Sequence, residues 1–185
     1  MARSSLPNSY IFWPVIGVIV VVDIITKAVA VEALIPRTIP RPVLGDWLRW
    51  TLVYNPGAAF GLNLGQHSRW IFMVLTVGAL VILWRLYTTT ARGDRLRTLA
   101  LGLVCAGAVG NLIDRVRSER GVVDFIDVGI GDMRWPTFNV ADMAVSTGAF
   151  LLAWVLWGED REAGAVAATT PAGGPSLPAE SRKAQ

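Results

Sequence analysis

Four apolar stretches, each close to the length that crosses a lipid bilayer, dominate this sequence. They cover roughly residues 11–31, 70–87, 96–113 and 138–157. About 20 helical residues span the hydrocarbon core of a membrane, so each stretch predicts a transmembrane helix. The hydrophobic share of 53% and the mean hydropathy of +0.47 are too high for an ordinary soluble domain of this length. The predicted fold class is mainly α: a polytopic membrane protein with four transmembrane helices.

The first apolar stretch has some features of a cleaved signal peptide. Arg3 precedes an apolar run, and Ala28-Val29-Ala30 resembles a small-residue cleavage site. However, the run continues through Asp23 and Lys27, and three further stretches follow it. We therefore expect this stretch to stay in the protein as a membrane span.

The two longer segments between spans, 32–69 and 116–137, contain β-prone pieces. Residues 48–54 alternate larger apolar side chains with smaller or polar ones, which is the period of a strand. A turn signal, Asn55-Pro56-Gly57, ends that piece, and Gly131-Asp132 marks another turn in the second segment. We predict that the two segments form a small sheet on one side of the membrane.

Arginines and composition predict the orientation and the boundary of the membrane domain. The short loop between the second and third spans is rich in arginine (Arg92, Arg95, Arg97), which predicts a cytoplasmic loop. Both termini would then be cytoplasmic and both long segments extracytoplasmic. Residues 159–185 are rich in Ala, Gly, Pro, Ser and charges, which predicts a disordered cytoplasmic tail after a membrane domain of residues 1–158.

Charge and ligand counts argue against several function classes. The net charge is only +3, and the arginines form no continuous basic face of the kind that binds nucleic acid. A single histidine, His67, and the absence of an HExxH motif argue against a zinc site. Cys105 lies inside an apolar run, where we expect an inert packing residue.

Two aspartates beside the last apolar stretch carry the strongest chemical signal. Asp142 lies in the run that opens this stretch, and Asp124 lies in the segment just before it. A carboxylate near hydrocarbon costs roughly 2.5–3.5 kcal/mol, so two at one membrane face suggest a site that shares a proton and activates water. A lone Asp142 would merely suit the positive end of a helix dipole, but the second acid weakens that interpretation. We predict an aspartic protease with Asp124 and Asp142 as its catalytic pair.

Further polar residues lie inside the other spans. Asp23 and Lys27 are four residues apart and share one helix face. They could form an internal ion pair or a polar support for a site, and the two interpretations are compatible. Asn111 and Asp114 lie at the outer end of the third span, on a face with small residues that permit close helix approach. For Asp114 we favour a structural contact with Arg115 or with a neighbouring helix.

Three residues near the acidic pair are candidates for substrate contact or support. Asn111 and Arg115 could face the site and hold a substrate backbone or a lipid phosphate, since a guanidinium makes paired bonds to such groups. Asn139 is three residues before Asp142, on the same helix face. Asp127 and Asp132 are expected to be solvated loop charges.

Two other functions remain as alternatives. A Ser/Lys signal peptidase would need Lys27 and Ser146, but Ser146 lies deeper than the acids and no Ser-x-x-Lys motif is present. A Ser–His pair would need His67, which has no GxSxG-type serine nearby. A non-enzymatic transporter or assembly module would line a polar path with Asp23, Lys27 and Asn111, but no inverted repeat supports it.

Five ordered runs together closely resemble the lipoprotein signal peptidase family, also called signal peptidase II. The runs are Asp23–Lys27, Asn55–Gly61, Gly107–Arg115, Val122–Phe125 and Phe138–Asp142. They cover about the first 160 residues in order and at family-like spacing. The small polar residue that usually follows the last aspartate is Met143 here.

The resemblance implies an enzyme of the bacterial cytoplasmic (inner) membrane. Its four helices would have both termini in the cytoplasm, with an extracytoplasmic β-cradle and a short amphipathic segment over the site. The substrate would be a prolipoprotein whose cysteine already carries diacylglycerol, cut just before that cysteine. We expect membrane lipid around a monomer, no metal or other cofactor, no nucleic-acid partner, and inhibition by globomycin.

The resemblance also assigns roles to residues. Asp124 and Asp142 would be the catalytic pair, and the family's polar surround corresponds to Asp23, Lys27, Asn55, Asn111, Arg115 and Asn139. Asn55 and Asn139 would orient the scissile peptide. Which aspartate acts as base stays open, because an interacting pair titrates as a unit.

Overall fold

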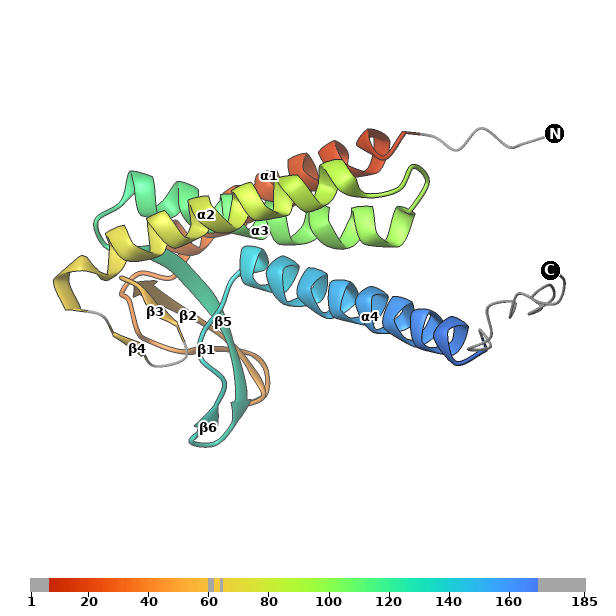
Figure 1. The fold of residues 1–185 in the computed structure, drawn as a ribbon. Helices are drawn as coiled ribbons and strands as arrows, with labels where there is room; N and C mark the ends of the chain where they lie inside the picture. Colours follow the sequence, from red (N-terminus) through yellow and green to blue (C-terminus); the bar gives the residue numbers. More distant parts are fainter. Residues whose placement is uncertain (1–6, 60–61, 64, 170–185) are drawn as a thin grey trace, which may run out of the picture.

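The computed structural model describes residues 7–59, 62–63 and 65–169, which form four long helices and a small antiparallel sheet (Figure 1). The helices are α1 Ser9–Ala33, α2 Ser68–Thr89, α3 Arg95–Arg117 and α4 Val140–Thr169. By length and composition, each contains a stretch able to cross a membrane. The predicted fold class is therefore confirmed.

The last helix is longer than its apolar stretch. It continues to Thr169, so the prediction of a disordered tail is wrong for residues 159–169. This part contains four Ala and two Glu, which favour helix, and Glu159 forms an ion pair with Arg97 of α3. Residues 170–185 lie outside the described part of the chain.

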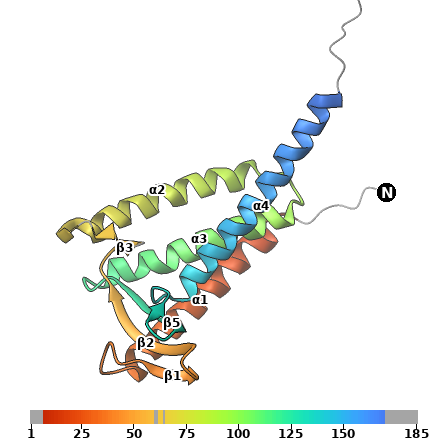
Figure 2. The ribbon, with the colours of Figure 1, turned by 90° about the horizontal axis from the view of Figure 1, so that it is seen from below.

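Helix α3 is the centre of the bundle and packs against the other three helices (Figures 1 and 2). Its small residues permit this close approach. A Cβ atom at Gly107 would collide with the carbonyl oxygen of Ala141 in α4, and one at Gly110 would lie 2.7 Å from Oδ2 of Asp23 in α1. The small-residue face predicted for the third span therefore contacts two helices at once.

The half of the bundle farther from the sheet is held by apolar packing. Phe12, Leu83, Leu101 and Cys105 form a buried cluster, as expected for Cys105. The ring of Phe12 stacks on that of Tyr87, with 3.8 Å between centroids. These contacts join the first three helices without a buried charge in the cluster.

A four-stranded antiparallel sheet in the order β1-β2-β5-β6 lies at the end of the bundle where α1 ends and α4 begins. Its strands are β1 Arg41–Leu44, β2 Leu48–Asn55, β5 Val122–Ile130 and β6 Met133–Arg134. A two-stranded piece, β3 Ala58–Ala59 with β4 Leu62–Asn63, and the 3-10 helix η1 Gly65–His67 precede α2. The alternation over residues 48–54 thus predicted a real strand, and the two long segments pair with each other as expected.

Phe138, shortly before α4, lies antiparallel to β5. The N–H groups of Phe125 and Ile126 both donate to the carbonyl oxygen of Phe138, at 3.0 and 2.8 Å, and Phe138 donates back to Ile126. This short antiparallel contact holds the start of α4 against β5. It therefore brings two sequence-distant acidic segments together.

Candidate active site

The side chain of Asn139 joins the strand that carries Asp124 to the helix that carries Asp142. Its Nδ2 donates to Oδ1 of Asp124 at 2.7 Å, and its Oδ1 accepts the backbone N–H of Asp142 at 2.9 Å. Asn139 is fully buried and Asp124 is 3% exposed, whereas Asp142 is half-buried. The two predicted acids therefore converge on one place, with Asp142 on its more open side.

The carboxylate of Asp142 is held in orientation by the start of its own helix. Asn139 precedes the first residue of α4, and Asp142 is the third residue. Asn139 caps the N–H of Asp142, and the N–H of Asn139 donates back to Oδ2 of Asp142 at 3.2 Å, which is a reciprocal capping box. Oδ1 of Asp142 accepts a hydrogen bond from Nδ2 of Asn111 at 2.7 Å. Both carboxylate oxygens thus have a donor.

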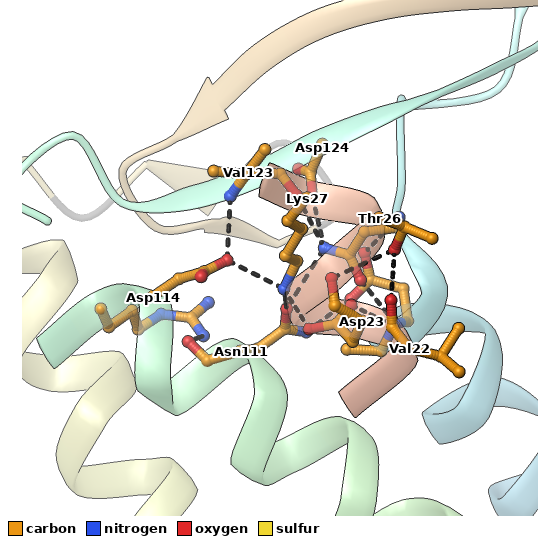
Figure 3. A network of polar contacts seen from close by, with 12 residues as sticks. Val22, Asp23, Thr26, Lys27, Asn111, Asp114, Val123 and Asp124 are labelled. Carbon is orange, nitrogen blue, oxygen red and sulfur yellow. Dashed lines mark hydrogen bonds and ion pairs between the residues drawn. The ribbon is translucent and has the colours of Figure 1, made fainter. Parts of the chain in front are cut away.

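Lys27 is at the centre of a buried polar cluster beneath the acidic pair (Figure 3). Its Nζ lies 2.7 Å from Oδ2 of Asp23 and 2.8 Å from Oδ2 of Asp114, and donates to Oδ1 of Asn111 at 3.1 Å. The predicted Asp23–Lys27 ion pair is confirmed. Asp114 contacts a neighbouring helix, which was one of the two expected structural contacts.

The cluster also determines which way the Asn111 amide points. An ammonium group can only donate hydrogen bonds, so the oxygen of Asn111 faces Lys27 and its NH₂ group faces Asp142. Asp23 contributes at the same point, because its Oδ1 accepts the N–H of Ala141 in the first turn of α4 at 2.9 Å. The first span therefore supports the orientation of Asp142.

Strands β2 and β5 place the remaining partners of Asp124. Val53 lies opposite Asp124, so Asn55, two residues further along β2, is a diagonal neighbour on the same face. The side chain of Asn55 hydrogen-bonds to Asp124, and its Oδ1 also accepts the N–H of Gly57 at 3.0 Å. On the other side, the N–H of Val123 donates to Oδ2 of Asp114 at 3.1 Å, which ties β5 to α3 (Figure 3).

Burial raises the pKa of Asp124 from its usual 3.8 to about 7, and the nearby charge of Asp142 adds to the increase. Hydrogen bonds from Asn139 and Asn55, and the positive charge of Lys27, act in the opposite direction but do not cancel it. The contacts agree with a raised pKa, because no cation among the described residues forms an ion pair with Asp124. Asp124 can therefore hold a proton near neutral pH.

Arg115 borders the acidic pair from the last turn of α3. Its charge interacts with those of Asp142, Asp124 and Asp114, and its Nη1 donates to the carbonyl oxygen of Asn111 at 3.2 Å. The guanidinium carbon lies 5.6 Å from the centroid of the Phe72 ring in α2. Arg115 thus lies beside the pair without forming a direct ion pair with either acid in the described residues.

The expectation for Asp127 is wrong. The residue is 7% exposed, and its carboxylate forms an ion pair with Nε of Arg134 at 2.8 Å. Its Oδ2 accepts a hydrogen bond from the hydroxyl of Thr51 at 2.9 Å. A hairpin at the predicted Gly131-Asp132 turn brings residues 127 and 134 together, which is the signal that could have indicated the pair. Asp132 is exposed, as expected.

The residues needed by the other catalytic classes are not assembled. His67 and Ser146 are both exposed, and the ion pairs and hydrogen bond described for Lys27 go to Asp23, Asp114 and Asn111. Within the family-like run 55–61, Phe60 and Gly61 lie outside the described residues. The other site residues suggested by the resemblance lie within one connected polar network.

Four membrane-length helices, with two carboxylates meeting where a small sheet covers their ends, define a polytopic membrane protein of the aspartic-peptidase type. The family model described as signal peptidase (SPase) II, of peptidase family A8, matches residues 15–158. The chain therefore belongs to the signal peptidase II family of bacterial multi-pass membrane peptidases.

Individual relatives agree with this membership. A lipoprotein signal peptidase of Polynucleobacter necessarius is 44% identical over 128 residues, covering 67% of this chain and 74% of that protein. One of Xanthomonas campestris is 38% identical over 155 residues, covering 83% and 92%. A solved structure described as a bacterial membrane enzyme, obtained by the in meso method, superposes with a TM-score of 0.71 at 31% identity, covering 79% of this chain and 87% of that one.

Proposed function

We propose that the protein performs the reaction of its family, removal of signal peptides from prolipoproteins, with Asp124 and Asp142 as the catalytic pair. The observation that carries the residue assignment is that Asn139 contacts both carboxyl groups: its side-chain Nδ2 donates to Asp124, and its backbone N–H donates to Asp142. We further propose that the substrate is a precursor already modified with diacylglycerol, and that it is cut before the lipidated cysteine. This part of the proposal is supported by the family-like runs that surround the two acids.

The surroundings of the two acids favour different roles. Asp142 accepts hydrogen bonds on both oxygens in the first turn of α4, so its carboxylate is fixed in place and is assigned the role of base. Asp124 is buried and has a pKa of about 7, so it is the protonated acid. Asp142 takes a proton from water, the water oxygen attacks the scissile carbonyl carbon, and Asp124 donates its proton as the leaving amine departs.

The asparagines divide between positioning and substrate contact. Asn139 is fully buried, and its Nδ2 lies within hydrogen-bonding distance of Asp124, Asn111 and the carbonyl oxygen of Val123. We therefore assign Asn139 to positioning the pair rather than to holding the peptide. Asn55 and Arg115 are half-buried at the edge of the pair and are better placed to contact the substrate backbone.

The orientation in the membrane follows from the positions of the arginines and of the site. The loop with Arg92 and Arg95 lies at one end of the bundle, with the start of α1 and the far end of α4, and the sheet lies at the other (Figure 1). Asn8 bonds to this loop through Ala91 and Gly93, at 3.0 and 2.9 Å. The positive-inside tendency therefore supports cytoplasmic termini and an extracytoplasmic site.

A lipid-attached substrate suits a site at the end of a bundle. The bilayer solvates the acyl chains, so the precursor can reach the site by lateral diffusion without a strong protein anchor for the lipid. All residues of the proposed site come from one chain, which supports a monomer. The proposed setting is the bacterial inner membrane, and the proposed chemistry uses neither metal nor cofactor.

A cleavage assay tests this function directly. Purified protein in lipid vesicles is given a diacylglyceryl-modified precursor or the same precursor without lipid, with and without globomycin. We expect cleavage of the lipidated precursor only, and inhibition by globomycin. Efficient cleavage of the unlipidated precursor would instead favour a Ser/Lys-type signal peptidase.

Two variants and one matched control test the residue assignment. Asp124→Asn and Asp142→Asn should abolish cleavage while the protein stays folded and inserted. Asp160→Asn makes the same change on an exposed residue near the opposite end of α4 and should leave cleavage intact. Substantial turnover by either of the first two variants would refute the acidic pair.

A further inference from the structure

Two neighbouring turns of the sheet expose an unusual concentration of large apolar side chains. These side chains, called the apolar tip below, are 55–82% exposed and comprise Leu44, Trp47, Ile130, Met133 and Trp135. The turns are joined, because the N–H of Gly129 donates to the carbonyl oxygen of Trp47 at 3.0 Å. Exposed apolar patches of this kind mark contacts with another molecule or with a membrane.

The apolar tip projects sideways from the helix bundle. In Figure 1 the β5–β6 hairpin extends away from the helices at about the level where α4 begins. Figure 2 shows the sheet crossing the direction of the helices in the perpendicular view as well. If the helices cross the bilayer, the tip therefore lies near the membrane surface instead of reaching far into the water.

The sheet is also continuous with the apolar surface of the first span. Ile25 and Val29 of α1 are 55% and 58% exposed, as expected of side chains that face lipid. With Trp50 and Phe125 of the sheet they line an apolar groove of about 330 Å³. Apolar surface thus passes from a membrane helix to the sheet that ends in the apolar tip.

Polar contacts at the base of the apolar tip, only partly shielded from solvent, hold its two turns together. Arg134 donates to the carbonyl oxygen of Asp46 at 2.7 Å and to Oδ1 of Asp127 at 2.8 Å. Asp46 also accepts the N–H of Gly131 at 2.9 Å and pairs with Arg49. These two acids and two arginines neutralise one another, and the further charge in the β5–β6 turn is that of the exposed Asp132. Attraction to the membrane would therefore come from apolar burial and not from charge.

We propose that the apolar tip inserts into the interface of the outer leaflet, between the lipid headgroups and the upper acyl chains. Tryptophan suits this region because its ring is apolar and its N–H remains close to water. The tip is then a second membrane contact, separate from the four spans. By this contact the tip keeps the sheet at a constant depth relative to the bilayer. Because β5 carries Asp124, the contact would also hold the active site at that depth, and this purpose rests on the proposed function.

Site-specific labelling measures the depth of the apolar tip. Cys105 is the only cysteine and is buried, so Met133→Cys in a Cys105→Ala background accepts a single environment-sensitive fluorophore. The protein is reconstituted in phosphatidylcholine vesicles that carry a quencher on the lipid headgroup or on the upper acyl chain. We expect blue-shifted emission, strong quenching by these lipids and protection from iodide in the water.

Glu119→Cys in the same background is the matched control. Glu119 is exposed in the turn after α3, at the same end of the bundle but outside the apolar tip. Its label should be quenched by iodide and not by the lipid quenchers. Equal accessibility of the two labels to iodide would overturn the proposal. So would protection at position 133 that weakens as protein is diluted in lipid, since this would indicate a second copy as the partner.

Charged variants test the purpose of the contact. Met133→Asp combined with Trp135→Asp should release the tip, which lowers cleavage in vesicles about tenfold and leaves cleavage in detergent micelles unchanged. An equal loss in both media would show that the tip serves folding or substrate contact and would overturn the assignment. Failure of the proposed function would appear as no cleavage by the wild type, while the labelling result does not depend on activity.

Discussion

Asp124 and Asp127 are two buried aspartates of the same strand with different surroundings. They are three residues apart in β5, so their side chains point to opposite faces, and they are 3% and 7% exposed. Asp127 meets the cation of Arg134 and the hydroxyl of Thr51. Asp124 meets two amides and, nearby, a second carboxylate.

The comparison shows that burial alone does not make an acid reactive. A buried carboxylate with a guanidinium partner is a stable structural ion pair. A buried carboxylate with only neutral donors and a like charge nearby retains a proton at a pH where other aspartates are ionised. The bundle supplies the second environment, because Lys27 forms its ion pairs with Asp23 and Asp114 and not with Asp124.

The largest expected effect is on turnover. Asp124→Asn removes the proposed acid and should lower kcat by about 10³-fold or more, in line with the loss of general acid catalysis. Asp127→Asn on the same strand should change kcat by no more than a few fold. The measurement is the rate of precursor cleavage in vesicles by equal amounts of folded protein. If the two variants were equally impaired, the distinction between the two acids would fail.

The second expected effect is the pH dependence of cleavage. The proposed mechanism needs a proton on Asp124, whose pKa is about 7. At pH values above this, the free enzyme loses that proton, so kcat/KM should fall, and the decrease should approach tenfold for each further pH unit. Asp127→Asn should show the same alkaline decline as the wild type, because Asp127 takes no part in it. A wild-type kcat/KM that stays constant from pH 6 to pH 9 would contradict the role of Asp124.

A smaller effect is expected at Lys27, which orients the amide of Asn111. Lys27→Met lets this amide rotate, which takes its NH₂ donor away from the carboxylate of Asp142. The kcat for cleavage should fall about tenfold, while KM stays within a few fold of the wild type. Asp114→Asn is the matched control, because it disturbs the same cluster and leaves the Lys27–Asn111 hydrogen bond in place.

The value of kcat per folded enzyme separates this positioning role from a general loss of structure. A merely structural effect would lower the amount of folded Lys27→Met protein and leave kcat per folded enzyme as in the wild type. An equal fall of kcat per folded enzyme in Lys27→Met and Asp114→Asn would also contradict the orienting role of Lys27.

The smallest effect, but the sharpest contrast, concerns stability at pH 8. Asp127→Asn leaves Arg134 without its carboxylate partner and should lower the free energy of unfolding by about 1–3 kcal/mol. Asp124→Asn should raise it by a similar amount, on the order of 1–3 kcal/mol, because it removes a buried charge. Thermal unfolding in detergent at pH 8 measures both.

The pH dependence of these stabilities checks the explanation. The folded-state pKa of Asp124, about 7, lies above its unfolded value of 3.8, so the folded state retains a proton that the unfolded state has released. Stability should therefore fall as pH rises from about 4 to 7, and this part of the decline should disappear in Asp124→Asn. Stabilisation by Asp124→Asn that is as large at pH 4 as at pH 8 would point to another cause.

Much of the architecture was predictable because its signals are local. The length of the apolar stretches predicted four helices, and the alternation over 48–54 predicted β2. Spacing of four residues predicted the Asp23–Lys27 pair, because such side chains adjoin on one helix face. The end of α4 was less predictable, since helix propensity and apolar length disagree beyond residue 158.

The sequence by itself determined which groups are costly to place near a membrane and roughly where along the chain they lie. Only the tertiary structure decided what each group meets, because the deciding partners come from distant segments. Asp124 meets Asn139 and Asn55, while Asp127 meets Thr51 and Arg134. The pairing of β2 with β5, and the contact of Phe138 with β5, determine these partners. Whether an aspartate can carry a proton at neutral pH depends on those neighbours and on its exclusion from water, and neither follows from local sequence.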